Sequence, residues 1–284
     1  MTIRKMIEAV SDELLAQGVE AAPTEARFLV ESVCKLNRKQ LLMHRDMILT
    51  DTEVAHIEEA VQRRLAGWPL QYLLGRWEFY GYPFIVGEGV LIPRADTETL
   101  VEAALTVMKE LPKPAVADLC SGSGCIAVAL ARQRADSRVM ALEFSEEAYP
   151  YLERNIALNE ATNVAPVKGN VAGEVSLGFA DTFDVIVSNP PYIKTSDMRT
   201  LQREVRFEPS IALDGRKDGL YFYREITRRW KPCLRAGGRL LYEVGFDQAE
   251  AVCAILQENG FECIETKNDL NGIARVVSGK KAMP

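Results

Sequence analysis

The sequence predicts an α/β protein in which a small helical bundle precedes a mostly parallel sheet covered by helices on both faces. Two patterns support this fold class. Apolar residues recur at helical spacing over roughly the first 75 residues, and after Pro112 short apolar runs alternate with helical segments. At 284 residues, with 48% hydrophobic and 26% charged residues, the chain is long enough for two domains and has the composition of an ordinary globular protein.

The N-terminal region contains three helical patterns. In the first pattern, apolar residues recur at helical spacing at Ile3, Met6, Ile7, Val10 and Leu14. In the second, they recur at Ala26, Leu29, Val30 and Val33. The third begins with a capping-box pattern at residues 50–53 (Thr-Asp-Thr-Glu) and continues with Val54, Ile57, Val61 and Leu65. Gly67 and Pro69 then end this helix. We therefore expect a helical domain over residues 1–75.

Residues 71–92 have a different character, with aromatic and β-branched residues interrupted by glycines. The β-formers are Trp77, Phe79, Tyr80, Tyr82, Phe84, Ile85 and Val86. This pattern predicts a β-hairpin that links two domains. We assign residues 76–92 to the hairpin linker and residues 93–284 to the second domain.

The second domain alternates strand and helix. The apolar strand candidates are residues 115–119, 139–142, 165–167, 183–188, 239–244, 261–265 and 274–277. Helical candidates lie between many of them, at residues 126–134, 146–159, 220–230 and 248–258. Alternation of this kind predicts a mostly parallel sheet buried on both faces.

Composition and charge exclude several classes of protein. No apolar run approaches the length of a membrane span. The N-terminus is amphipathic and has an acidic residue within its first residues, unlike a secretory signal. The six cysteines form no Cys-x-x-Cys pair, and His44 and His56 cannot complete a zinc site, so no metal is expected and a reducing cytoplasm is the simplest compartment. The net charge of −6 argues against a large nucleic-acid footprint. Nothing demands more than a monomer.

A local basic cluster remains, and we expect it to be a solvated helix face. Its members are Arg224, Arg228, Arg229 and Lys231.

A glycine-containing loop joins the first strand to its helix at residues 118–127 (Asp-Leu-Cys-Ser-Gly-Ser-Gly-Cys-Ile-Ala). Glycines there let the backbone approach a ligand closely, and Glu143 ends the next strand, where an acid can bind ribose hydroxyls. Gly122-x-Gly124-x-x-Ala127 also fits a dinucleotide fingerprint, so NAD and a tight structural turn stay open on the loop alone. Asn170 and Val171 follow the third strand; they suit an adenine ring, although a turn explains Asn170 equally well.

The most informative motif is Asn189-Pro190-Pro191-Tyr192, which follows the apolar strand 183–188. Ligands bind at this edge of open α/β sheets. Two prolines stiffen the loop and remove two backbone donors, which leaves carbonyl acceptors. Asn189 adds a side-chain acceptor and Tyr192 adds a flat ring. Such a site suits a planar –NH2 group and indicates methyl transfer to an amide or amino nitrogen.

Together these motifs resemble class I S-adenosylmethionine-dependent methyltransferases that modify amide or exocyclic amino nitrogens. Further segments narrow the resemblance to the HemK/PrmC family, the protein-(glutamine-N5) methyltransferases of peptide chain release factors. These segments are residues 90–98 (Val-Leu-Ile-Pro-Arg-Ala-Asp-Thr-Glu), Gln71-Tyr72, Gly75-x-x-Glu78-Phe79, residues 206–209 (Arg-Phe-Glu-Pro), Ala212-Leu213, residues 25–27 (Glu-Ala-Arg) and residues 41–44 (Leu-Leu-Met-His). The similarity runs over nearly the whole chain.

The resemblance implies a seven-stranded Rossmann-like domain that binds S-adenosylmethionine and releases S-adenosylhomocysteine. It also implies a helical domain that recognises class 1 release factors, whose Gly-Gly-Gln glutamine is the substrate. Carried over by position, the cofactor-binding residues are Asp118, Cys120, Ser121, Gly122, Ser123, Gly124, Glu143, Asn170, Val171 and Asn189. The substrate-binding residues are Asn189, Pro190, Pro191 and Tyr192, of which Asn189, Pro190 and Tyr192 are the catalytic residues.

Three positions depart from the family pattern. Cys120 replaces a common glycine, which indicates that this position does not require a positive φ. Glu143 and Asn170 stand where the family commonly has aspartate. Each substitution keeps a workable chemical role.

We hypothesise that the Asn189 oxygen and the Pro190 carbonyl accept the two protons of a substrate amide, while Tyr192 packs against its plane. The main alternative is an adenine-N6 nucleic-acid methyltransferase, which the acidic charge disfavours. A dehydrogenase would leave the Asn189 motif unexplained. A non-catalytic adaptor that keeps the fold is a third possibility.

Overall fold

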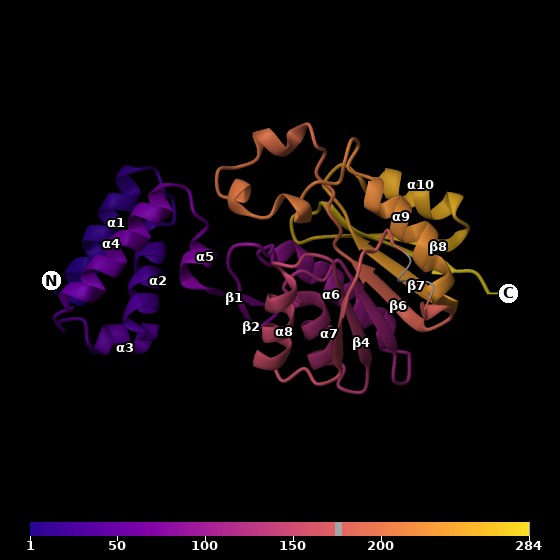
Figure 1. Cartoon of the computed structure of the whole chain (residues 1–284), viewed down its shortest axis with the longest axis horizontal. Coiled ribbons are helices and arrows are strands. Elements are labelled where there is room, and N and C mark those ends of the chain that lie inside the picture. The colour runs from indigo at the N-terminus through magenta and orange to yellow at the C-terminus, as the bar shows by residue number, and fades with distance from the viewer. Residues whose placement is uncertain (174–177, 284) are drawn as a thin grey trace. The chain divides into compact units, whose positions relative to one another are not determined.

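The chain forms two compact units in the computed structural model, which describes residues 1–173 and 178–283. One unit comprises Met1–Arg76 with Gln202–Phe207, and the other comprises Trp77–Leu201 with Glu208–Pro284 (Figure 1). Among the residues described, every helix is too short or too polar to cross a bilayer.

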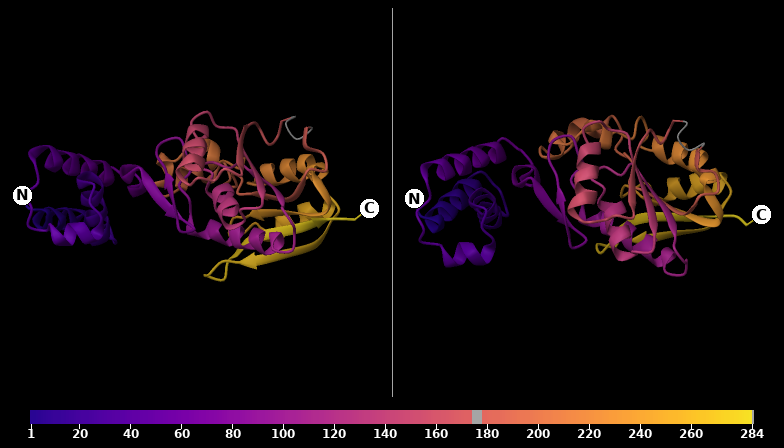
Figure 2. Two further views of the ribbon diagram at one scale, coloured as in Figure 1. Left: turned by 90° about the horizontal axis from the view of Figure 1, so that it is seen from below. Right: turned by 60° about the horizontal axis from the view of Figure 1, so that its bottom comes forward.

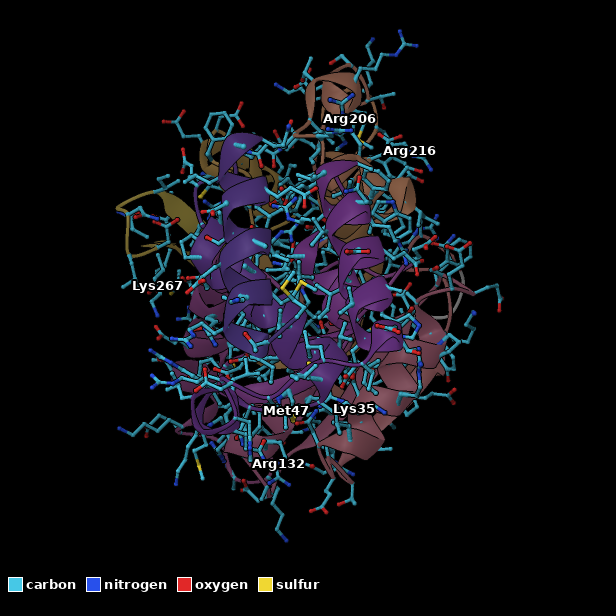
Figure 3. The ribbon with its side chains drawn as sticks, turned by 90° about the vertical axis from the view of Figure 1, so that its left-hand side faces the viewer. Lys35, Met47, Arg132, Arg206, Arg216 and Lys267 are labelled. Atoms are coloured by element: carbon cyan, nitrogen blue, oxygen red, sulfur yellow. The ribbon has the colours of Figure 1, made fainter. Side chains whose placement is uncertain are left out.

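The first unit is a bundle of α1 (Ile3–Ala16), α2 (Ala22–Cys34), α3 (Arg38–Met43), α4 (Asp51–Leu65) and α5 (Leu70–Leu74). The helices bury the apolar faces that their spacing predicts, including Ile3, Met6, Val10, Leu14, Ala26, Leu29, Val30, Ile57 and Val61. The predicted capping box is confirmed, because Thr50 and Glu53 each accept a hydrogen bond from the other's backbone N–H. Lys35 and Met47 lie at the same end of this bundle (Figure 3).

A segment distant in sequence, Gln202–Phe207, packs with this bundle. Arg64 is buried and pairs with Glu25 at 2.5 Å and with Glu204 at 2.8 Å. Phe207 packs on Trp68 with ring centroids 5.3 Å apart. Periodicity does not point to this segment, because its attachment depends on individual side chains and not on a repeating apolar face.

The predicted hairpin is present as β1 (Arg76–Phe79) and β2 (Tyr82–Ile85). Its two-residue turn has positive φ at Tyr80 (52°) and Gly81 (74°), as a type I′ turn requires. Phe79 and Phe84 meet edge to face at 6.1 Å and are fully buried in the core of the second unit. The hairpin therefore belongs structurally to the second unit.

The second unit contains a seven-stranded sheet within the described residues, in the order β5-β4-β3-β6-β7-β9-β8. Its strands are β3 (Ala115–Leu119), β4 (Arg138–Glu143), β5 (Val164–Lys168), β6 (Phe183–Ser188), β7 (Leu234–Glu243), β8 (Phe261–Asn268) and β9 (Ala274–Lys281). The neighbouring strands β5, β4, β3, β6 and β7 run parallel, which confirms the predicted α/β fold class. The antiparallel pair β8 and β9 forms one edge (Figure 2).

Helices cover both faces of this sheet. Buried side chains of α6 (Glu98–Met108), α7 (Cys125–Gln133) and α8 (Tyr149–Leu158) form one core with alternate strand residues. Those of α9 (Tyr221–Trp230) and α10 (Ala249–Glu258) form the other. Short 3-10 turns complete the unit: η1 (Ala95–Thr97), η3 (Asp197–Thr200), η5 (Ser210–Ala212) and η6 (Lys231–Cys233). Another turn, η4 (Val205–Phe207), lies in the segment that packs with the bundle.

Some elements differ from the sequence expectation. Helix α6 was not expected, although Leu100, Val101, Ala104 and Met108 have helical spacing. Strand β7 starts five residues earlier than its apolar run, because a bulge around Gly237 (φ 75°) lets Leu234 pair again with Phe183 of β6. The basic cluster on α9 is largely a solvated face, as expected, with Arg228 and Arg229 both paired to Glu225.

Candidate active site

The strand order reverses between β3 and β6, so the loops that follow these strands diverge and leave a crevice at the carboxyl edge. A cavity of about 940 Å³, counted to its open mouth, lies there. The predicted residues on its wall are Cys120, Ser121, Gly122, Ser123, Glu143, Asn170, Val171, Asn189 and Pro191.

The glycine-containing loop and the strand-end acid are joined directly. Gly122 N–H donates to Glu143 Oε2 at 2.7 Å, and Ser145 N–H donates to Glu143 Oε1 at 2.6 Å. These bonds use one position on each oxygen and leave further lone pairs for a ligand hydroxyl. Glu143 is 8% exposed on the cavity wall. The geometry therefore suits an acid that receives ribose hydroxyls beside the loop.

The expectation for the backbone at Cys120 is wrong. Its φ is 61°, in the left-handed region, like Gly122 at 58° and Gly124 at 82°. The loop turns sharply there, and a cysteine tolerates a conformation that glycine adopts at lower cost. At Gly124 a side chain would meet Leu152 Cδ1 at 2.6 Å, so this glycine serves the packing of α7 against α8.

Asp118 lies beneath the loop and does not line the cavity. It is fully buried, and its Oδ2 accepts from Ser121 Oγ at 2.6 Å and from Ala127 N–H at 3.1 Å. Burial raises the pKa of Asp118 to about 7 against the opposing effect of these two hydrogen bonds. The structure thus places Asp118 behind the cavity wall, where its bonds to Ser121 and Ala127 shape the loop.

The residues expected near adenine have distinct environments. Asn170 Oδ1 accepts from Ala172 N–H at 2.9 Å, which is the turn that its residue type favours. Val171 is 5% exposed and its carbonyl accepts from Trp230 Nε1 at 3.0 Å. Both line the cavity. Val171 thereby offers an apolar contact that Trp230 of α9 holds in place.

The Asn189 motif forms a tightly held loop after β6. Pro190 and Pro191 are buried, and Gln248 Nε2 donates to the Tyr192 carbonyl at 3.0 Å. A side chain at Gly215 would meet Tyr192 Cα at 2.7 Å, so a glycine is required for this close approach. Asn189 and Pro191 reach the cavity wall, whereas Pro190 and Tyr192 do not line it.

The Asn189 side chain is held by Thr97, which also lines the cavity. Its Nδ2 donates to Thr97 Oγ1 at 3.3 Å, which leaves Oδ1 available as an acceptor. The Tyr192 hydroxyl lies 3.5 Å from Glu243 Oε1. Burial raises the pKa of Glu243 to about 7, while hydrogen bonds from Thr97 and Asn189 and the charge of Arg275 lower it. Asn189 is thus part of a connected polar cluster.

Several residues of the site belong to no motif whose chemistry pointed to it. Thr97 and Arg94 line the cavity, and Arg94 forms an ion pair with the buried Glu208. Glu208 also accepts from Ile92 N–H at 3.0 Å, which ties two distant segments together at the wall. Segments 90–98 and 206–209, which carry part of the family resemblance, are thus joined through Glu208.

The fold, the cavity at the strand-order reversal and the acid at the end of β4 define an S-adenosylmethionine-dependent methyltransferase with a Rossmann-like fold. Solved structures share this fold. The hMettl16 catalytic domain aligns with a TM-score of 0.58 at 14% identity, over 83% of this chain and 85% of that one. A methyltransferase from Pyrococcus furiosus aligns with a TM-score of 0.52 at 17% identity, over 82% and 100%.

Sequence comparison narrows the class to one family. Residues 5–75 match the PrmC N-terminal domain, and residues 96–206 match the methyltransferase small domain. The release factor glutamine methyltransferase of Geobacter sulfurreducens is 42% identical over 98% of this chain and 96% of its own length. That of Fusobacterium nucleatum is 39% identical over 95% of this chain and 76% of its own. The chain belongs to the family of release factor glutamine methyltransferases.

Proposed function

We propose that this protein transfers a methyl group from S-adenosylmethionine to the side-chain nitrogen (N5) of the glutamine in the Gly-Gly-Gln motif of class 1 release factors. S-adenosylhomocysteine is the second product. The observation that supports this most is the position of Asn189, which lines the cavity and whose nitrogen already donates to Thr97 Oγ1. Family membership identifies the amide as a glutamine of a release factor.

The cavity residues fit S-adenosylmethionine. Glu143 suits the ribose hydroxyls, Val171 and Leu142 provide apolar contacts for the adenine ring, and the backbone around Gly122 is open, since a side chain there would meet nothing within 4 Å. When bound, the cofactor supplies an electrophilic methyl group on a positively charged sulfur. The protein's task is therefore to hold and orient a weak nucleophile in front of that group.

We assign the orienting role to Asn189 and Pro190. The Asn189 Oδ1 and the Pro190 carbonyl accept the two N–H groups of the substrate amide and stabilise positive charge that develops on its nitrogen. No side chain has to act as a dedicated base, because the proton becomes acidic once the nitrogen is alkylated. Tyr192 packing against the amide plane stays a prediction, and its contacts with Gln248 and Glu243 support a second role in holding the loop.

We further propose that the helical domain, residues 1–75, recognises the release factor, with the hairpin 76–92 as linker and residues 93–284 as the catalytic domain. Release factors act at cytoplasmic ribosomes, so we expect the protein to act there as a monomer without direct nucleic-acid contact. The alternative, adenine-N6 methylation of nucleic acid, is disfavoured by the net charge of −6 and by the family match.

Incubation with S-adenosylmethionine and a full-length release factor, followed by mass spectrometry of the peptide that carries the Gly-Gly-Gln motif, tests the proposal. We expect one added methyl group on the glutamine. Double-stranded DNA and a release factor whose motif glutamine is replaced by alanine serve as control substrates. Methyl transfer to DNA, or equal transfer to the altered release factor, would overturn the assignment.

A further inference from the structure

Glu243, at the carboxyl end of β7, is a buried acid that the methyl-transfer step described above does not use. Its Oε1 lies 3.5 Å from the Tyr192 hydroxyl, and its Oε2 is a buried oxygen without a hydrogen-bond partner in the described part of the chain. Thr97 and Asn189 lie close enough to lower its pKa. Thr97 Oγ1 also accepts from Asn189 Nδ2 at 3.3 Å. The Asn189 nitrogen, the Thr97 hydroxyl and the Glu243 carboxylate thus belong to one polar cluster.

The two orientations of an asparagine amide have nearly the same shape, and its hydrogen-bond partners decide between them. An ionised carboxylate only accepts hydrogen bonds, so it attracts the NH2 end and repels the oxygen end. We propose that Glu243 is a positioning residue that, with the Thr97 hydroxyl, holds Asn189 with its nitrogen inward and its oxygen toward the substrate amide. This inference rests on the proposed function, because the outward oxygen matters only if Asn189 accepts a substrate N–H.

Charged groups from several elements surround Glu243. Arg275 of β9 lies 3.1 Å from Asp96 and 3.2 Å from Asp269. Its charge lowers the pKa of Glu243, and the charge of Asp96 raises it. The other titratable groups that act on or respond to Glu243 are Tyr192, Tyr223 and Cys125. Burial is the largest effect and sets the pKa of Glu243 near 7.

Protonation of Glu243 would weaken the positioning. A neutral carboxyl group carries a donor, and this donor can bind the Asn189 oxygen in the flipped orientation. Turnover should therefore fall as the pH drops below about 7. Asp118 has a similar raised pKa, so substitution of Glu243 is needed to show which acid is responsible.

The test uses Glu243→Gln and Glu243→Leu in the full-length protein. Glu243→Gln keeps one acceptor and cannot ionise, whereas Glu243→Leu has a similar volume and no acceptor. Glu265→Gln is the matched control, because Glu265 lies on β8 with its side chain 66% exposed and pairs only weakly with Arg239 at 3.3 Å. We expect turnover on a release factor to fall by about tenfold or more in Glu243→Leu and less in Glu243→Gln. The dissociation constant of S-adenosylmethionine should stay unchanged.

The pH profile and one spectroscopic signal separate positioning from a general loss of structure. The acidic limb near pH 7 should disappear in Glu243→Gln and persist in Glu265→Gln. In a substrate-free sample with S-adenosylmethionine, the side-chain NH2 resonances of Asn189, assigned by their loss in Asn189→Ala, should be protected from exchange in the wild type. They should lose that protection in Glu243→Leu.

Wild-type turnover in both Glu243 variants would overturn the inference, and so would an unchanged acidic limb in Glu243→Gln. If the proposed function itself were wrong, the result would differ, because the wild type would then leave the Gly-Gly-Gln peptide unmethylated. The exchange measurement needs no release factor and reports the Asn189 orientation in either case. Unprotected Asn189 resonances in the wild type would also contradict the positioning role.

Discussion

The side chain of Asn189 carries the largest share of the proposed chemistry. It stands at the tip of β6, its nitrogen bonds to Thr97, and its oxygen remains for a substrate. Neighbouring prolines limit the motion of the loop backbone. A single side chain can therefore be tested with little risk to the fold.

Asn189→Ala should lower turnover by a factor of about 10² or more, because it removes one oriented acceptor for the charge that develops on nitrogen. Binding of S-adenosylmethionine, measured by calorimetry, should remain close to that of the wild type. Asn271→Ala, in the exposed β8–β9 loop, is the control. Near-normal turnover of Asn189→Ala would rule out the assigned role.

Cys120 offers a test of backbone strain. Its φ of 61° is unfavourable for a side chain with a Cβ, so Cys120→Gly should raise the free energy of unfolding by about 1 kcal/mol. Cys253→Gly, inside α10, should instead lower it by about 1 kcal/mol because glycine is a poor helix former. Denaturant titration measures both, and a destabilised Cys120→Gly would contradict the strain argument.

Among the secondary-structure elements, α4 shows how a local pattern sets a boundary. Thr50 and Glu53 satisfy each other's backbone N–H groups, and the helix starts at Asp51 as the capping pattern predicts. At the other end Gly67, with φ 97°, follows the last turn. Strand β7 is the contrasting case: its first half has no apolar run and pairs only because β6 lies beside it.

Thr50→Ala should destabilise the helical unit by about 1 kcal/mol through loss of the side-chain cap. Thr52→Ala, exposed in the first turn of the same helix, should have little effect. Thermal unfolding followed by circular dichroism compares the two variants. Equal effects of both substitutions would mean that the cap contributes nothing measurable.

For the protein as a whole, two buried acids make stability depend on pH. The ordinary pKa values of Asp118 and Glu243 are 3.8 and 4.5, and burial raises both to about 7 in the folded state. Because the folded state binds these protons more tightly, their stabilising contribution is full below the ordinary values and is lost as the pH rises through about 7.

Glu243→Gln removes one of these groups, so its melting temperature relative to that of the wild type should rise between pH 5 and pH 8, because the wild type alone loses the contribution of this carboxyl group. Differential scanning calorimetry at several pH values measures the change. A constant difference at all pH values would show that Glu243 does not titrate in this range.

The sequence was sufficient to predict features that depend on residues close together in the chain. Periodicity located most helices and strands, although not α6 or the first half of β7. The capping box at Thr50 set a helix start, and the Asn189 motif marked the edge of the sheet where the cavity lies. These signals work because backbone geometry and burial impose regular spacing on nearby residues. It was insufficient for Thr97 and Glu243, which meet the Asn189 loop across 92 and 51 residues. Those contacts exist only once parallel strands bring distant loops to one edge, so only the tertiary structure decided which side chains surround the Asn189 loop.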